Sequence, residues 1–282
     1  MLLLLIVSVV WAFSFGLLKS LVGLDPVAIA VARLGFAALV FVPLLRPRRV
    51  PTRVALQLAG IGAVQFGVMY VCYIWAFRFV AAYEVALFTI FTPLYVALVE
   101  AALARRVVPQ HLVAALLAIA GAGVMLWQRG IGSNVSTGFL LMQASNLCFA
   151  AGQIWYRRTR SASPSTSDAA LFGWLYLGAL ATVGVISVGT TDWSTFRPTS
   201  NQTLVLVYLG LVASGLGFFG WNLGALRVNA GTLAVFNNLK IPLAVAVSLL
   251  VFGEQANLTR LLVSFALIAA GVAVAERRSR GP

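Results

Sequence analysis

The feature that most constrains this chain is a series of long apolar runs, separated by short segments that carry arginine or turn residues. The hydrocarbon core of a bilayer is about 30 Å thick, and a helix needs about 20 predominantly apolar residues to cross it. Each run is apolar around most of its circumference, as contact with lipid or with other membrane helices requires. The runs fall near residues 2–18, 27–45, 55–76, 83–104, 112–127, 138–155, 169–188, 203–223, 232–252 and 258–275. The sequence therefore predicts an all-α integral membrane protein of about ten transmembrane helices.

The composition excludes a water-soluble globule. The 282 residues are 61% hydrophobic and 10% charged, whereas a soluble domain is about 45–50% apolar and about 25% charged. The net charge of +13 does not indicate a nucleic-acid partner, because the arginines cluster in short loops between the apolar runs. The first run has no charged leader before it, so we expect a retained helix and not a signal peptide.

The distribution of arginine and lysine predicts the orientation of the chain, because these residues are enriched in cytoplasmic loops. One set of alternate loops and the tail are rich in them: Arg46, Arg48, Arg49, Arg53, Arg105, Arg106, Arg157, Arg158, Arg160, Arg227, Arg277, Arg278 and Arg280. The opposite set carries them singly: Lys19, Arg78, Arg129, Arg197 and Arg260. We therefore expect both termini to be cytoplasmic in a multi-pass protein of a bacterial-type inner membrane.

An internal repeat supports an even number of helices. The stretch Ala76-Phe-Arg-Phe-Val-Ala81 aligns without gaps on Ala225-Leu-Arg-Val-Asn-Ala230, and in the same register Pro93 falls on Pro242. With an odd number of helices in each half, the second half enters the membrane upside down relative to the first. The pattern thus predicts two inverted five-helix repeats, a plan of secondary transporters whose substrate site lies near the midplane.

Several segments resemble one family of transporters. They are Trp11-Ala-Phe-Ser-Phe-Gly16, Pro26 with Arg33, Phe91-Thr92-Pro93, Lys240-Ile241-Pro242 and Phe252-Gly253-Glu254. Together they resemble the drug/metabolite transporter superfamily, specifically its EamA-type proteins. The run from Trp221 to Thr232 is similar to YddG-like amino-acid exporters. The resemblance implies EamA-type repeats over 1–130 and 137–276, a cytoplasmic tail over 277–282, and transport of a small metabolite, with amino acids as the first candidate.

Lys240 is the most informative candidate residue, because it lies well inside the ninth predicted helix. A lysine at that depth costs at least about 2.5–3.5 kcal/mol on insertion scales. A functional interpretation is a cation that faces a central cavity and attracts a substrate carboxylate. The alternative is a lysine that pairs with an internal acid or extends toward the interface.

Polar residues and prolines surround this lysine. Asn237 shares its helix face and Asn238 lies near the same face. Both are candidates for substrate binding, although asparagines also join membrane helices without touching substrate. Pro242 and its repeat partner Pro93 predict paired bends that act as hinges for alternating access.

Aromatic residues are the remaining candidates for the cavity wall. Phe88 and Phe91 occupy the register positions of Asn237 and Lys240 in the first half. Nearby candidates are Tyr70, Tyr73, Thr92, Tyr95 and Trp221. For each aromatic side chain taken singly, core packing or contact with lipid is the favoured interpretation.

The sequence contains no pattern typical of catalysis, such as GxSxG, HExxH or a phosphate-binding loop. Cys72 and Cys148 lie inside apolar runs without metal-ligand spacing. We therefore expect no enzyme, no cofactor and no metal site. The prediction is a secondary transporter, an exporter or exchanger of amino acids or similar metabolites, that functions as a monomer. Multidrug, carboxylate or nucleotide-precursor transport by the same fold remains the alternative.

Overall fold

The computed structural model describes residues 2–103, 134–161, 167–227 and 230–276, with isolated positions between 105 and 124. Its described elements are all helices. They are α1 (Leu2–Lys19), α2 (Pro26–Phe41), η1 (Val42–Leu44), η2 (Pro47–Arg49), α3 (Thr52–Gly62), η3 (Ala63–Val68), α4 (Met69–Ala76), α5 (Ala82–Phe88), η4 (Thr89–Phe91), α6 (Thr92–Leu103), α8 (Asn134–Ser161), α9 (Asp168–Thr190), α10 (Ser200–Val207), η6 (Tyr208–Leu216), α11 (Gly217–Leu226), α12 (Ala230–Leu250) and α13 (Leu258–Glu276).

The predicted helices agree with these elements wherever the structure describes them. The runs near 55–76, 83–104 and 203–223 each correspond to one continuous path of two helices and a short intervening segment. The run near 138–155 is longer than predicted, since α8 extends from Asn134 to Ser161. The fifth predicted helix, 112–127, lies largely outside the described residues.

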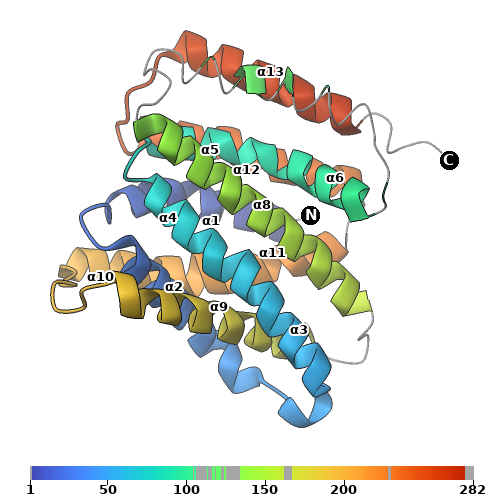
Figure 1. The fold of residues 1–282 in the computed structure, drawn as a ribbon. Helices are drawn as coiled ribbons and strands as arrows, with labels where there is room; N and C mark the ends of the chain where they lie inside the picture. Colours follow the sequence, from blue (N-terminus) through green and yellow to red (C-terminus); the bar gives the residue numbers. More distant parts are fainter. Residues whose placement is uncertain are drawn as a thin grey trace.

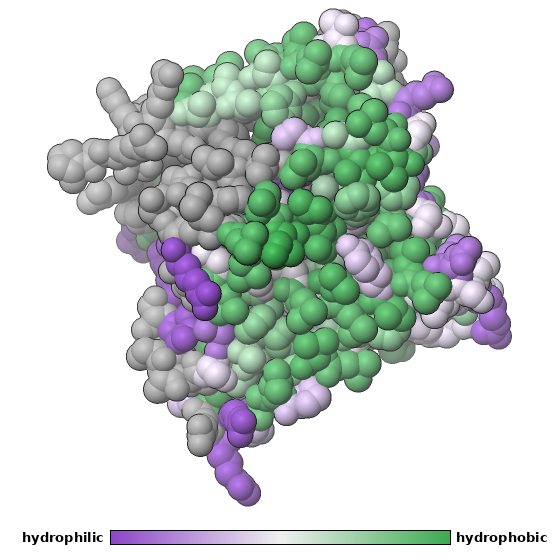
Figure 2. Space-filling model, turned by 180° about the vertical axis from the view of Figure 1, so that it is seen from behind, coloured by the Kyte–Doolittle hydropathy of each residue, from purple (hydrophilic) through white to green (hydrophobic). Residues whose placement is uncertain are grey.

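The outer surface of the helices fits a bilayer. Six stretches are long and apolar enough to cross a membrane: Leu2–Lys19, Pro26–Leu44, Thr52–Ala76, Ala82–Leu103, Asp168–Thr190 and Ser200–Gly224. In the view of Figure 2, hydrophobic residues form a broad face across the middle, and hydrophilic residues gather mainly toward the two ends. Several large apolar side chains of the membrane-crossing stretches, such as Leu39, Leu56 and Val185, are more than half exposed. A lipid environment removes them from water.

The helices form a stack in which α1 takes a central place. In Figure 1, α13 and the α2–α3 pair lie at opposite edges, and α1 lies between them. α1 packs against α12, α11 and α5, whereas α2 and α3 pack against α9. The start of α1 and the end of α13 point to the same side of the molecule (Figure 1).

Three of the membrane-crossing paths are interrupted near their middle. The fourth path contains the 3₁₀ segment η4 directly before Pro93, whose ring nitrogen has no hydrogen to donate to the helix. The paths over Thr52–Ala76 and Ser200–Gly224, which are the third and eighth in the order of the ten predicted runs, contain the π-helical segments η3 and η6. In contrast, α12 is one continuous helix that includes Pro242. An interruption is therefore present beside Pro93 but not beside Pro242.

Glycines permit an unusually close approach of α3 and α9. A Cβ atom added to Gly178 would lie 1.9 Å from the carbonyl oxygen of Ala59. A Cβ atom added to Gly62 would lie 1.9 Å from the carbonyl oxygen of Leu175. The two backbones thus touch directly, as small residues allow in membrane helix pairs.

The loop after α12 is bound by hydrogen bonds to the start of α5 in the first half of the chain. The Glu254 carboxylate accepts hydrogen bonds from the backbone nitrogens of Ala82 (2.9 Å) and Tyr83 (3.0 Å) at the start of α5. A carboxylate at this position satisfies free N–H groups and complements the helix dipole. The Phe252 ring covers Gly16 so closely that any added side chain would collide with it. These contacts join elements that are far apart in the sequence.

Candidate functional site

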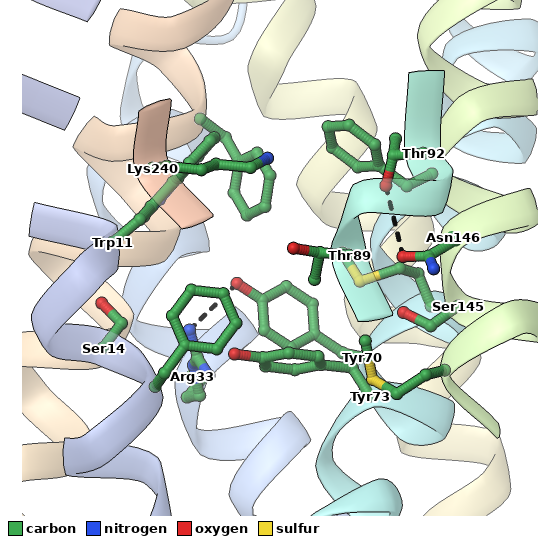
Figure 3. A pocket seen from close by; sticks show the side chains of 15 residues that line it. Trp11, Ser14, Arg33, Tyr70, Tyr73, Thr89, Thr92, Ser145, Asn146 and Lys240 are labelled. Carbon is green, nitrogen blue, oxygen red and sulfur yellow. Dashed lines mark hydrogen bonds between the residues drawn. The ribbon is translucent and has the colours of Figure 1, made fainter. Parts of the chain in front are cut away.

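A cavity lies at the centre of the stack, where α1, α2, α4, α6, α8, α11 and α12 meet. The space that the centre of a water-sized sphere can occupy inside it is about 90 Å³, enough for several water molecules. Its lining combines two cations, several hydroxyl and amide groups, and aromatic rings (Figure 3). The lining residues are Trp11, Ser14, Phe15, Arg33, Met69, Tyr70, Tyr73, Thr89, Thr92, Met142, Ser145, Asn146, Phe149, Phe218 and Lys240.

Arg33 of α2, in the lower left part of Figure 3, is held by a network of hydrogen bonds. Its Nε and Nη2 atoms donate to Ser214 Oγ at 3.2 and 3.1 Å, and Nη2 also donates to the Tyr70 hydroxyl at 3.1 Å. The guanidinium of Arg33 lies over the face of the Tyr70 ring, with Cζ 4.5 Å from the ring centroid. Arg33 is only 3% exposed, and its Nη1 atom has no hydrogen-bond partner in the described part of the chain. The side chain is therefore held firmly but keeps an unmatched positive charge.

The π-helical segment η6 explains how this network is positioned. A π-turn shifts carbonyl groups out of the regular α-helical pairing and is frequent at functional sites. Here the Ala213 carbonyl accepts from Trp11 Nε1 at 2.9 Å, and the Ser214 carbonyl accepts from the Tyr176 hydroxyl. The Ser214 hydroxyl donates to the Leu209 carbonyl and accepts from Arg33. The interruption in the eighth path thus connects α1, α2 and α9 beside the cavity.

Lys240 of α12 reaches the cavity from a different side. Its Nζ atom lies 5.2 Å from the ring centroid of Trp11 and 5.4 Å from that of Trp221. Distances below about 6 Å are favourable for a cation and an aromatic face. Within the described residues, Lys240 makes no hydrogen bond and no ion pair, although it is 7% exposed. Its ammonium group therefore retains all its donors for a ligand.

The wall opposite Lys240 carries uncharged polar groups from α6 and α8 (Figure 3). Thr92 Oγ1 donates to Asn146 Oδ1 at 3.2 Å, and Asn146 Nδ2 donates to the Phe88 carbonyl at 2.8 Å. These two bonds fix the orientation of the carboxamide. Ser145, the neighbour of Asn146, also faces the cavity and is 3% exposed. The cavity thus has a cationic side and a neutral hydrogen-bonding side.

None of the seven acidic residues of the chain is among the described residues that line this cavity. Three of them lie at the start of a helix: Asp25 caps α2, Glu84 lies in the first turn of α5, and Asp168 begins α9 and pairs with Arg160. Glu100 lies toward the end of α6 and Glu276 ends α13. Asp192 lies in the loop after α9, and Glu254 lies in the loop after α12, where it contacts the start of α5. Among the described residues, therefore, no carboxylate lines the cavity beside Arg33 and Lys240 to neutralise their positive potential.

The structure brings together only some of the residues that the sequence singles out. Lys240, Tyr70, Tyr73 and Thr92 line the cavity. Trp221 is buried behind the lining. Its ring lies beside that of Trp11, with the two centroids 5.1 Å apart, and near the Lys240 ammonium group. The side chains of Asn237, Asn238 and Pro93 lie outside the described residues, and the Pro242 ring is exposed on the outer surface of α12.

Three predicted aromatic residues do not line the cavity. Phe88 is completely buried against Phe139, and Phe91 packs in a second apolar cluster with Ile241. Tyr95 lies at the edge of the same cluster. In this part of the chain the residues that line the cavity are Thr89 and Thr92, which lie three residues apart across the 3₁₀ segment η4 and therefore on one face.

Arg33, Ser145, Asn146 and Trp11 line the cavity but were not among the predicted site residues. A signal for two of them is present in α8, where Met142, Ser145, Asn146 and Phe149 follow the spacing of one helix face. A pair of polar residues within such a stripe indicates a face that meets water or ligand. The signal for Arg33 is its position inside an apolar run.

Comparisons with known proteins point to one family of transporters. Residues 1–127 match the model of the EamA-like transporter family. The chain is 40% identical to a "Probable biotin transporter" of Pseudomonas aeruginosa, over 95% of both chains. It is 36% identical to a "Biotin transporter" of Salmonella typhimurium, over 96% of this chain and 91% of that protein.

Two more distant similarities concern the fold and another cargo. The chain is 29% identical to the "Aromatic amino acid exporter YddG" of Ancylobacter novellus, over 78% of this chain and 75% of that protein. One solved structure, described only as the crystal structure of a protein, has a TM-score of 0.67 at 23% identity and covers 100% of this chain and 98% of its own. This last similarity shows a shared fold.

Proposed function

Because the chain belongs to the EamA-like transporter family of the drug/metabolite transporter superfamily and is therefore a membrane transporter and not an enzyme, we propose that its cargo is a small carboxylate, with biotin as the first candidate. The observation that carries this proposal is the pair of cations in one cavity, Arg33 and Lys240, without an acidic residue beside them. A carboxylate that enters the cavity supplies the missing charge.

The chemistry of the wall favours biotin over an amino acid. Biotin has one carboxylate and no ammonium group, whereas an amino acid also carries an ammonium group that needs an acceptor. All seven acidic residues of the chain lie elsewhere. Placing an ammonium group between Arg33 and Lys240 adds a third positive charge to a buried site, which is unfavourable. Amino acids remain the second candidate, supported by the relative that is named an amino-acid exporter.

Transport by the purified protein distinguishes these candidates. After reconstitution into liposomes, we expect radiolabelled biotin to exchange with unlabelled biotin across the membrane, and radiolabelled phenylalanine to exchange much more slowly. Protein-free liposomes provide the background. A protein that exchanges phenylalanine rapidly and biotin not at all would contradict the carboxylate proposal and favour the amino-acid alternative.

The proposed mechanism is alternating access between two inverted repeats, 1–130 and 137–276, around the central cavity. In the register that aligns Ala76 with Ala225, the π-helical segment η3 falls on residues 212–217, which overlap η6. This correspondence supports a repeated architecture in the third and eighth paths. The location of the cavity between the halves agrees with a site at a repeat interface.

The proposed orientation places both termini and the loop around Arg48 in the cytoplasm, and the loop around Ser194 outside. Both positions are exposed, and they lie at opposite ends of the helices (Figure 1). In a variant without Cys72 and Cys148, an impermeant thiol reagent applied to intact cells should label Ser194→Cys but not Arg48→Cys. Permeabilised cells should label both. Labelling of Arg48→Cys alone in intact cells would reverse the orientation.

A further inference from the structure

Ser145 differs from several other buried or half-buried serine and threonine residues in the membrane-crossing helices. Ser8, Ser14 and Thr182 each donate to the backbone carbonyl four residues earlier, at 2.8 to 2.9 Å. This local bond is the usual way in which a helix satisfies a buried hydroxyl. The Ser145 hydroxyl makes no hydrogen bond within the described part of the chain, although the residue is 3% exposed. It faces the cavity (Figure 3), so its donor and its lone pairs are both available there.

The groups beside Ser145 complete a set of fixed donors and acceptors. Asn146 uses one amide hydrogen on the Phe88 carbonyl and one lone pair on Thr92. It keeps a second lone pair on Oδ1, and Thr92 keeps the lone pairs of its hydroxyl oxygen. A ligand group that fits this wall offers a carbonyl for the Ser145 hydroxyl and N–H groups for the oxygens of Thr92 and Asn146. A cyclic urea or a lactam has this pattern.

We propose that Ser145, Thr92 and Asn146 form a second subsite, which binds an uncharged urea-like or amide-like ring of the substrate while Lys240 binds its carboxylate. This inference rests on the proposed carboxylate transport and specifies it further. The substrate class is a carboxylate whose far end carries a neutral ring with N–H and C=O groups. Figure 3 shows the two sides of the cavity opposite each other, with the aromatic rings of Tyr70 and Tyr73 along one edge. Biotin has both chemical ends, since its ring system contains a cyclic urea.

The test compares two carboxylates that differ in the ring. Biotin carries the cyclic urea, whereas lipoate carries a sulfur ring without N–H or C=O groups. Binding of radiolabelled biotin to the purified protein, with lipoate as competitor, gives both affinities. Ser145→Ala should weaken biotin binding about three- to tenfold, the range for one hydrogen bond, and leave the affinity for lipoate unchanged. Thr92→Val, which keeps the side-chain shape but releases Asn146, should show the same selectivity.

The matched control is Ser8→Ala, which also removes a fully buried serine hydroxyl from a membrane helix but not from the cavity wall. It should change neither affinity. Equal losses for biotin and lipoate in Ser145→Ala, or no loss for either, would overturn the second subsite and leave carboxylate transport intact. If the unmodified protein binds neither compound, the proposed function itself fails.

Discussion

Replacing Lys240 with methionine is expected to lower the apparent affinity for biotin about ten- to a hundredfold. Methionine has a similar length and an apolar character, so α12 should insert at least as well as before. The variant loses the ammonium group that lies near Trp11 and Trp221 without a fixed partner. A hydrogen bond to a charged group is worth about 1.5–3 kcal/mol, and about 1.4 kcal/mol corresponds to a factor of ten. The measurement is the concentration dependence of biotin exchange in liposomes.

The control for this prediction is a biotin analogue in which an alcohol replaces the carboxylate. It should bind the unmodified protein weakly, and Lys240→Met should change its affinity much less than that of biotin. This comparison separates a direct contact from general damage to the cavity. If the variant exchanges biotin normally, or weakens both compounds by the same factor, Lys240 has a structural role and the carboxylate binds elsewhere.

Replacing Gly178 with leucine is expected to prevent correct folding. At this position the first added carbon already falls 1.9 Å from the Ala59 carbonyl oxygen, which is a backbone atom and cannot rotate away. The backbones of α3 and α9 must then separate along much of their contact. Inserting extra atoms into a packed core usually costs about 1–3 kcal/mol, and a rigid backbone neighbour places this case at or beyond the upper limit. The measurement is the amount of monodisperse protein after detergent extraction, which should fall close to zero.

The same helix provides the control, Gly184→Leu. A Cβ atom at Gly184 has no other atom within 4 Å, so the side chain has room. Its yield and melting temperature should match those of the unmodified protein. Equal yields for the two variants would show that the close approach of α3 and α9 is not required for folding.

The membrane-crossing helices could be predicted because the signal for each is local. A run of about 20 apolar residues needs the same environment whatever its neighbours are, and all the described runs are helices within a few residues of their predicted bounds. Lys240 could be singled out for a related reason, since a charge inside an apolar run is costly wherever it occurs. The sequence alone therefore led to the helices, to Lys240 and to three further lining residues, Tyr70, Tyr73 and Thr92.

The other side of the cavity depends on local departures from the α-helix, which the apolar pattern does not reveal. Thr92, which follows the 3₁₀ segment η4, lines the cavity, whereas Phe88, which precedes it, is buried in the core. The π-helical segment η6 places Ser214 against Arg33. Both segments have apolar sequences like those of the regular helices around them, so the apolar pattern does not show where the α-helix is interrupted.

The partners of Arg33 also have a consequence for the order of events during synthesis of the chain. Tyr70 follows Arg33 by 37 residues, but Ser214 follows it by 181 residues. At about 5–20 residues per second, the ribosome needs on the order of ten seconds or more to make the intervening chain. The stretch Pro26–Leu44 is long and apolar enough to enter the membrane despite the arginine. During this interval the arginine must be solvated by water, lipid headgroups or Tyr70. Arg33 therefore reaches its final polar contacts only after the path over Ser200–Gly224, which contains Ser214, has been translated.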